Sequence, residues 1–98
     1  SRSWRPDVNT QLRVLEELLR AIQREHSLVD SERTSAATDV SLEAAAFLCR
    51  DAISALRDGQ GPVAADMLQR VARMAVDEWA LGSPLTARVT ECAQLMGR

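Results

Sequence analysis

Residues 8–29 decide the fold of this chain and read VNTQLRVLEELLRAIQREHSLV. Within them, apolar side chains and the single histidine recur at alternating intervals of four and three residues. The positions are Val8, Leu12, Leu15, Leu19, Ile22, His26 and Val29. This period predicts a long helix that presents a narrow apolar stripe to other helices. Leu18 widens the stripe, so we expect the helix to contact more than one neighbour.

The same kind of pattern predicts three further helices, over about residues 40–57, 62–80 and 85–96. Residues that cap or break helices stand between the predicted segments. They are Asp7 or Asn9 before the first helix, Thr38 or Asp39 before the second, Gly59, Gly61 and Pro62 before the third, and Gly82, Ser83 and Pro84 before the fourth. We therefore expect the third helix to continue to Ala80, with Gly82 ending it.

The 98 residues have the length of a single domain. Four amphipathic helices predict an all-α fold, either a compact four-helix bundle or an orthogonal four-helix array. We expect residues 1–6 to be a loose lead-in, in which Trp4 folds back over the bundle or contacts a partner. Residues 30–39 are expected to form the longest loop, which lets the second helix cross over or lets the loop flex.

The composition argues against several classes of protein. All 12 basic residues are arginine and tyrosine is absent, which is typical of a GC-rich bacterial or phage genome. A net charge of −2 argues against a nucleic-acid binder and against binding to an anionic membrane surface. The longest apolar run, Ala44–Cys49, is far shorter than the roughly 20 residues of a membrane span. Since no signal-peptide pattern opens the sequence, we expect a cytoplasmic protein.

Motifs for catalysis and for cofactor binding are missing from the sequence. Cys49 and Cys92 lie on predicted apolar helix faces without the spacing of a zinc site, so we expect free, buried thiols. Glu78 is expected on the apolar side of the third helix, but no second acid or histidine can be placed beside it. The simpler interpretation is a glutamate at the helix end that pairs with an arginine or reaches water. Neither a nucleophile elbow nor a phosphate loop occurs. The sequence therefore predicts no enzyme and implies no metal, cofactor or small-molecule ligand.

His26 opens a short motif that leaves one alternative function open. Residues 26–31 (HSLVDS) resemble the phosphoacceptor motif of histidine phosphotransfer domains, His-x-Leu-Lys-Gly-Ser, and those domains are four-helix bundles. The resemblance implies a signalling protein that is phosphorylated on His26. Val29 and Asp30 depart from the lysine and glycine of the motif, and an anionic Asp30 would repel a phosphoryl group. The simpler interpretation is a partly buried, hydrogen-bonded histidine at the end of a helix.

A second resemblance implies a DNA-binding regulator. Residues 81–89 (LGSPLTARV) resemble the turn and the start of the recognition helix in helix-turn-helix domains, Leu-Gly-x-Ser-x-x-Thr-Val. One residue is missing after Gly82, and Glu78 stands where that family has a small residue. Only Arg88 and Arg98 are basic in this part of the chain, while a recognition helix needs donors for base edges. The alternative is an ordinary turn between two helices.

Phe47, the only phenylalanine, falls opposite the apolar face of the second helix, among Glu43, Arg50 and other polar residues. Exposed aromatic and arginine side chains are typical of interaction hot spots. If the second helix is central in the fold, Phe47 is a core residue instead. We expect Trp79 to be a core residue whose indole N–H is hydrogen-bonded.

These observations favour a non-enzymatic protein–protein interaction module, such as a small regulator, adaptor or assembly subunit. We expect it to self-associate as a homodimer through helix faces, with Phe47, Glu43 and Arg50 as partner-binding residues. The first predicted helix is much longer than the last. Part of its apolar stripe is therefore expected to overhang the core and to be available to a second copy.

Overall fold

The computed structural model describes residues 7–96, so the expected lead-in over residues 1–6, with Trp4, lies outside the described part. Four helices make up the described fold: α1 (Val8–Ser27), α2 (Asp39–Arg57), α3 (Gly61–Glu78) and α4 (Pro84–Met96). A short 3₁₀ helix, η1 (Asp30–Glu32), lies between α1 and α2. The predicted boundaries are therefore correct to within two residues, as expected for helix ends.

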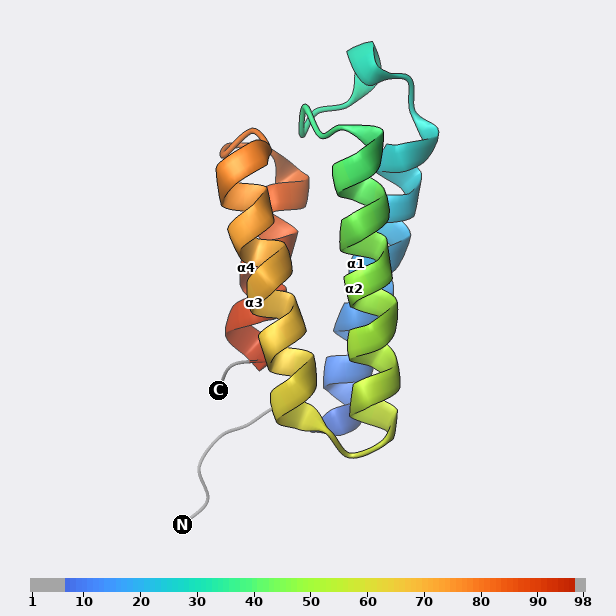
Figure 1. Ribbon diagram of the computed structural model, residues 1–98, viewed down its shortest axis with the longest axis vertical. Coiled ribbons are helices and arrows are strands. Elements are labelled where there is room, and N and C mark those ends of the chain that lie inside the picture. The colour runs from blue at the N-terminus through green and yellow to red at the C-terminus, as the bar shows by residue number, and fades with distance from the viewer. Residues whose placement is uncertain (1–6, 97–98) are drawn as a thin grey trace.

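The helices run alternately up and down and form a four-helix bundle, not an orthogonal array (Figure 1). Each helix packs on the next one in the chain, and α1 also packs on α4. Among residues 7–96, no helix combines the length and the apolar character needed to cross a membrane.

Short polar side chains and one glycine set the helix boundaries. The side chains of Asp7 and Thr38 accept hydrogen bonds from backbone N–H groups in the first turns of α1 and α2, at 2.8 and 3.1 Å. The Ser83 hydroxyl does the same for α4, at 3.1 Å from the Thr86 nitrogen. After α2, Gly59 adopts a left-handed conformation with φ of +78°, which glycine allows without strain. The next N–H, of Gln60, then donates back to a carbonyl of the last turn at 2.7 Å.

The third helix ends earlier than predicted, at Glu78 and not at Ala80. Trp79 is already extended, and its indole Nε1 donates to the Ser41 hydroxyl on α2 at 2.9 Å. The Ala80 N–H donates to the Ser35 carbonyl in the α1–α2 connection at 2.7 Å. These two bonds to distant parts of the chain replace the last helical turn. Glu78 lies exposed at the end of α3, as expected for a helix-end glutamate that reaches water, and not on the apolar side of the helix.

The core fills the space between the four helices with aliphatic, alanine and cysteine side chains. The largest fully buried side chains are Leu15, Leu18, Ile22, Leu42, Cys49, Leu68, Val71, Val89 and Cys92. The predicted stripe of α1 is buried at its centre and exposed only at its ends, Val8 and Val29. Because α2 is nearly as long as α1 and packs along it, the stripe is covered within the chain.

Arg33 closes the C-terminal end of α1. Its side chain is only 3% exposed. The guanidinium donates to the backbone carbonyls of Glu25, His26 and Leu28 at 3.1, 3.0 and 3.0 Å, and to that of Ala37 at 3.1 Å. The last carbonyls of a helix have no hydrogen-bond donors within the helix, and here the Arg33 side chain supplies donors to three of them. The charge itself is paired with carboxylates at positions 30 and 39.

A second set of bonds joins the α1–α2 connection to the α3–α4 turn. The Glu25 carboxylate accepts from both the backbone N–H and the hydroxyl of Ser35, at 2.9 and 2.5 Å. The Ser35 carbonyl in turn accepts from Ala80. Ala36, between these bonds, has a φ of +58°, a strained conformation that persists only where its surroundings hold it. The connection, which the sequence expected either to let the second helix cross over or to flex, is thus bonded both to Glu25 of α1 and to Ala80 of the α3–α4 turn.

Replacing Arg33 tests how much this closure contributes to stability. We expect Arg33→Met, which keeps the aliphatic stem, to lower the free energy of unfolding by about 2 kcal/mol, because it strands partly buried carbonyls. Urea unfolding followed by circular dichroism measures the loss. Arg73→Met, on the exposed face of α3, is the matched control and should change stability by less than about 0.5 kcal/mol. Equal unfolding midpoints for the two variants would contradict the role of Arg33.

The two thiols allow a second test of the packing. Burial raises the pKa of Cys49 and that of Cys92 to about 12, so little thiolate forms at pH 8. We expect the native protein to react with Ellman's reagent on the order of a hundredfold or more slowly than the chain unfolded in urea. Both thiols should react in urea because both are free. Rapid reaction of the folded protein would show that the core is not closed around them.

Candidate protein-interaction surface

Phe47 is the one large apolar side chain that is exposed in the middle of a helix within residues 7–96. The exposed large apolar residues there are Val8, Leu28, Val29, Val40, Phe47, Val63, Val76 and Leu81. All except Phe47 lie in connections or within the first or last turn of a helix, where exposure is ordinary. Phe47 is 60% exposed halfway along α2, so the question left open by the sequence is answered: it is a surface residue.

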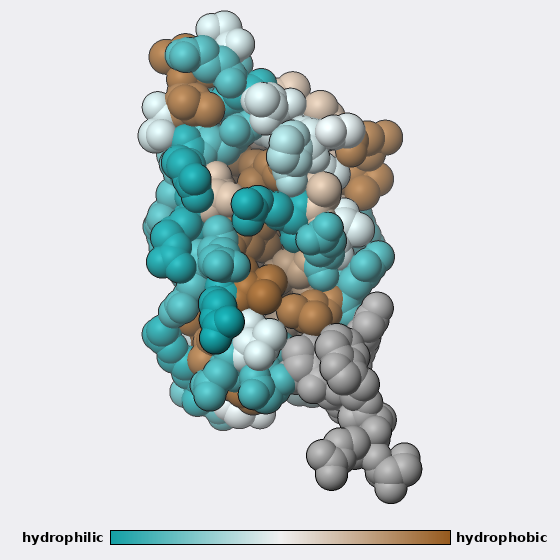
Figure 2. Space-filling view, turned by 180° about the vertical axis from the view of Figure 1, so that it is seen from behind, coloured by the Kyte–Doolittle hydropathy of each residue, from teal (hydrophilic) through white to brown (hydrophobic). Residues whose placement is uncertain are grey.

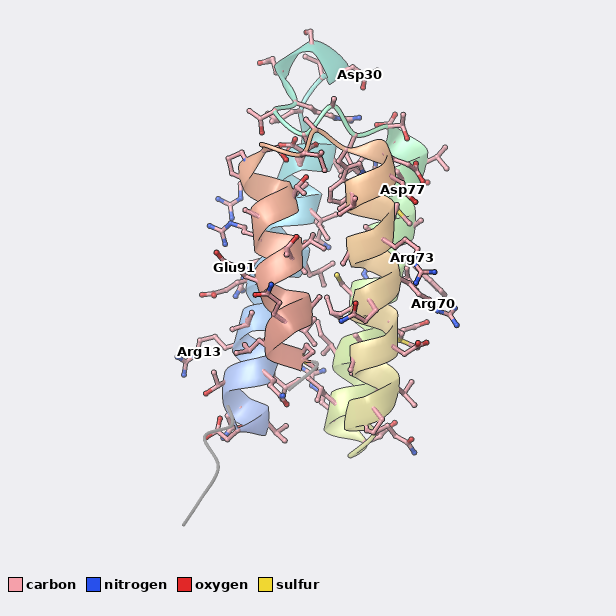
Figure 3. All side chains as sticks on the ribbon, turned by 90° about the vertical axis from the view of Figure 1, so that its left-hand side faces the viewer. Arg13, Asp30, Arg70, Arg73, Asp77 and Glu91 are labelled. Carbon is pink, nitrogen blue, oxygen red and sulfur yellow. The ribbon has the colours of Figure 1, made fainter. Side chains whose placement is uncertain are left out.

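The outer side of α2 therefore differs from that of its neighbour α3. Charged side chains such as Arg70, Arg73 and Asp77 point away from the bundle on α3 (Figure 3). On α2, Val40 and Phe47 are separated by seven residues and lie on one side of the helix, because 3.6 residues make a turn. We call this side the Phe47 face. It comprises the exposed residues Val40, Glu43, Phe47, Arg50 and Ser54.

Charge changes sign along α2 on either side of Phe47. Asp39 and Glu43 occupy the N-terminal part of the helix, and Arg50 and Arg57 the C-terminal part. This order complements the helix dipole. Arg57 is held by the Glu16 carboxylate of α1, with an N–O distance of 3.1 Å. Arg50 forms no ion pair with any described residue and is free to contact another molecule.

A shallow cleft lies beside the Phe47 face, between α1 and α2. It has a volume of about 430 Å³, with Leu19 and Ile53 among the side chains that line it. Arg50 and Ser54 belong both to the cleft and to the Phe47 face. The structure thus brings Phe47 and the expected partner-binding residues Glu43 and Arg50 onto one exposed face, and adds a cleft lined mainly by polar residues that the sequence did not indicate.

His26 is partly buried in the last turn of α1, as the simpler interpretation of the sequence expected, although its ring forms no hydrogen bond with a described residue. Its side chain is 37% exposed, and Nε2 lies 3.7 Å from a carboxylate oxygen of Asp39 and 3.8 Å from one of Glu43. The end of the bundle is closed by Arg33, which binds the His26 carbonyl at 3.0 Å. Two carboxylates near Nε2 oppose the placement of a phosphoryl anion there, through like-charge repulsion.

Helix α4 does not have the setting of a DNA-recognition helix. In helix-turn-helix motifs the two helices cross at about 90–120°. Here α3 and α4 run antiparallel side by side, and α4 packs on α1 as well (Figure 1). Arg88 is exposed, whereas Thr86 is buried and hydrogen-bonded to the Ser83 hydroxyl. Arg98 lies outside the described residues.

Other reactive side chains do not gather into a centre. Within residues 7–96, no group of three or more His, Cys, Asp or Glu side chains is placed to hold a metal ion. Cys49 and Cys92 are buried, and the raised pKa of each thiol suppresses the thiolate that a nucleophile needs.

Comparison of the chain with protein-family models, with curated proteins and with solved structures finds no match in any of the three. The function is therefore inferred from the surface of residues 7–96 alone. The sequence identified Phe47, Glu43 and Arg50 on this surface. It did not identify Arg33 or Glu25, because most of their contacts depend on how separate segments fold together. An arginine within a polar loop is the only local signal.

The Asp39 carboxylate makes the stability of this end of α2 depend on pH. The hydrogen bond from Arg33, and then the Arg33 charge, lower the pKa of Asp39 below its ordinary value of 3.8. A carboxyl whose pKa is lower in the folded state stabilises the fold above its unfolded pKa, and this contribution is lost as the pH falls through the folded pKa.

We therefore expect stability to decrease below about pH 4, and less steeply in Asp39→Asn. Urea unfolding at a series of pH values between neutrality and pH 3 measures both slopes. Asp77→Asn, at an exposed carboxylate of α3 (Figure 3), is the control and should follow the native protein. If Asp39→Asn loses stability in parallel with the native protein, the contact with Arg33 does not control the titration.

Proposed function

We propose that this chain is a non-enzymatic protein–protein interaction module that self-associates as a homodimer through the Phe47 face of α2. The observation that carries the proposal is the exposure of Phe47 in the middle of a helix whose other side is core. A buried aromatic anchor flanked by charged residues is the common composition of an interface hot spot. Such a module acts as a small regulator, adaptor or assembly subunit.

The order of charges on α2 supports a second copy as the occupant. Glu43 precedes Phe47 by four residues and Arg50 follows it by three, which is roughly 6 Å and 4.5 Å along the helix axis. A two-fold axis at Phe47 would make the two α2 helices antiparallel. Phe47 would then contact Phe47 of the second copy, and Glu43 would lie beside Arg50 of that copy. The same pair would form twice, as a closed symmetric interface requires.

The flanks of the face are compatible with this arrangement. Asp51 lies on the side of Phe47 away from Arg50, four residues after Phe47, and Ala44 lies three residues before it. The two-fold axis would place Asp51 beside Ala44 of the second copy, so that no like charges meet. Because the surface offered is a single helix stripe, we expect the dimer to be weak and to depend on protein concentration.

The setting of the module is part of the proposal and rests on composition. The arginine-only set of basic residues supports a bacterial origin. The two cysteines are free, which fits a reducing compartment such as the cytoplasm. The stripe of α1 is not used in this dimer, because α2 already covers its centre.

Solution mass by light scattering at two concentrations tests the dimer. The native protein should rise from its chain mass of 10.8 kDa towards twice that value as concentration increases tenfold. Phe47→Glu should remain a monomer with unchanged helicity and an unfolding free energy within about 0.5 kcal/mol of the native protein, since Phe47 is exposed. Val63→Glu, at an exposed apolar residue near the start of α3, is the control and should still dimerise.

Charge reversal tests the antiparallel arrangement. Glu43→Arg alone should weaken dimerisation, because it brings two arginines together, and Glu43→Arg combined with Arg50→Glu should restore it. A native protein that is monomeric at both concentrations, or a Phe47→Glu variant that still dimerises, would contradict the proposal.

A further inference from the structure

A second hollow, which shares no residue with the Phe47 face, lies where α1 and α4 meet. Seen from behind, apolar surface is visible between hydrophilic side chains along the middle of this side (Figure 2). At the end of the bundle near η1 the surface sinks into a cavity of about 260 Å³. Its apolar lining comes from Ala21 of α1, Leu28 after α1, and Leu85 of α4. Ligand sites in helical bundles commonly lie between helices in this way.

Two arginines give this cavity a positive charge. Arg24 of α1 and Arg88 of α4 both line it, from different helices, and both are exposed. Neither forms an ion pair with another residue of the described range 7–96. Glu25 also lines the cavity, but its Oε2 atom is already bound by the N–H and the hydroxyl of Ser35. The lining therefore carries two guanidinium groups and one carboxylate that is already hydrogen-bonded. The cavity consequently favours an anionic ligand.

The wall of the cavity is held in place before any ligand arrives. The Leu28 carbonyl accepts from Arg33 at 3.0 Å, and Thr34 stands between Arg33 and Ser35, both of which are buried and hydrogen-bonded. A pre-formed wall reduces the entropy that binding must offset. The Ser27 hydroxyl already donates to the Arg24 carbonyl at 2.6 Å. The Thr34 hydroxyl has no hydrogen bond to a described residue and can donate to a ligand.

We propose that this cavity binds a linear amphipathic monocarboxylate of medium chain length. The carboxylate lies between Arg24 and Arg88, whose planar guanidinium groups match its two oxygens, and accepts from Thr34. The alkyl chain lies on Ala21, Leu28 and Leu85. The volume holds roughly eight or nine non-hydrogen atoms, at the ~30 Å³ that a water molecule takes in the liquid, so octanoate fits with one end of its chain at the opening. This site does not depend on dimerisation through α2.

Titration of the ¹⁵N-labelled protein with sodium octanoate tests the site by two-dimensional NMR. Saturable shifts should concentrate on the amides of residues 21–28, 34 and 85–88, and amides in the middle of α2 should not move. Arg24→Gln combined with Arg88→Gln should weaken octanoate binding about tenfold or more, because both charge-assisted contacts are lost. Arg73→Gln removes one exposed arginine of α3 and is the control, which should bind as the native protein does.

Neutral 1-octanol separates recognition of the carboxylate from partition into an apolar hollow. We expect 1-octanol to bind the native protein more weakly than octanoate does, and equally to the native protein and to the double variant. Equal affinities of the native protein for the alcohol and the acid would overturn the proposal, as would shifts that do not saturate or that spread over all four helices. The double variant must keep the native helicity, which is expected because both arginines are exposed.

Discussion

The guanidinium group of Arg33 is the contact on which one whole end of the bundle depends. Burying a charge is unfavourable unless every donor finds a partner. The group donates five hydrogen bonds, to the carbonyls of Glu25, His26, Leu28 and Ala37 and to the Asp39 carboxylate, and Asp30 is a second ion-pair partner. An arginine can do this because it carries five donors in one plane, a property that lysine lacks. The end of α1 and the approach to α2 are thus determined by a single side chain.

Two consequences follow from this closure. The first is that Arg33 holds Asp39 at the start of α2. The carboxylates of Asp39 and Glu43 then both lie near the His26 ring, and this part of α2 is acidic. The second is that Ser35 is placed where it can bind both Glu25 and Ala80, so that the α1–α2 connection and the α3–α4 turn form one continuous structure. A loop that would otherwise be free becomes a wall of the cavity between α1 and α4.

The described core consists mainly of aliphatic side chains, alanines and two free thiols, and the buried indole of Trp79 is satisfied by the hydroxyl of Ser41. Two surface features stand out: the Phe47 face of α2 and the cavity lined by Arg24 and Arg88. Because they share no residues, the two proposals can fail independently.

Neighbouring residues account for the elements of this fold. Four helices, the Ser83 cap and the glycine stop after α2 follow from the local sequence, because helical period and capping are local properties. The sequence left two candidate caps each for α1 and α2, and the structure selects Asp7 and Thr38. The sequence also grouped Phe47, Glu43 and Arg50, since residues three and four apart share a helix face. Tertiary packing selects a bundle over an array and leaves Phe47 on the surface. It also ends α3 at Glu78 and brings Arg24 and Arg88 to one cavity, because each of these outcomes depends on groups that are far apart in the chain.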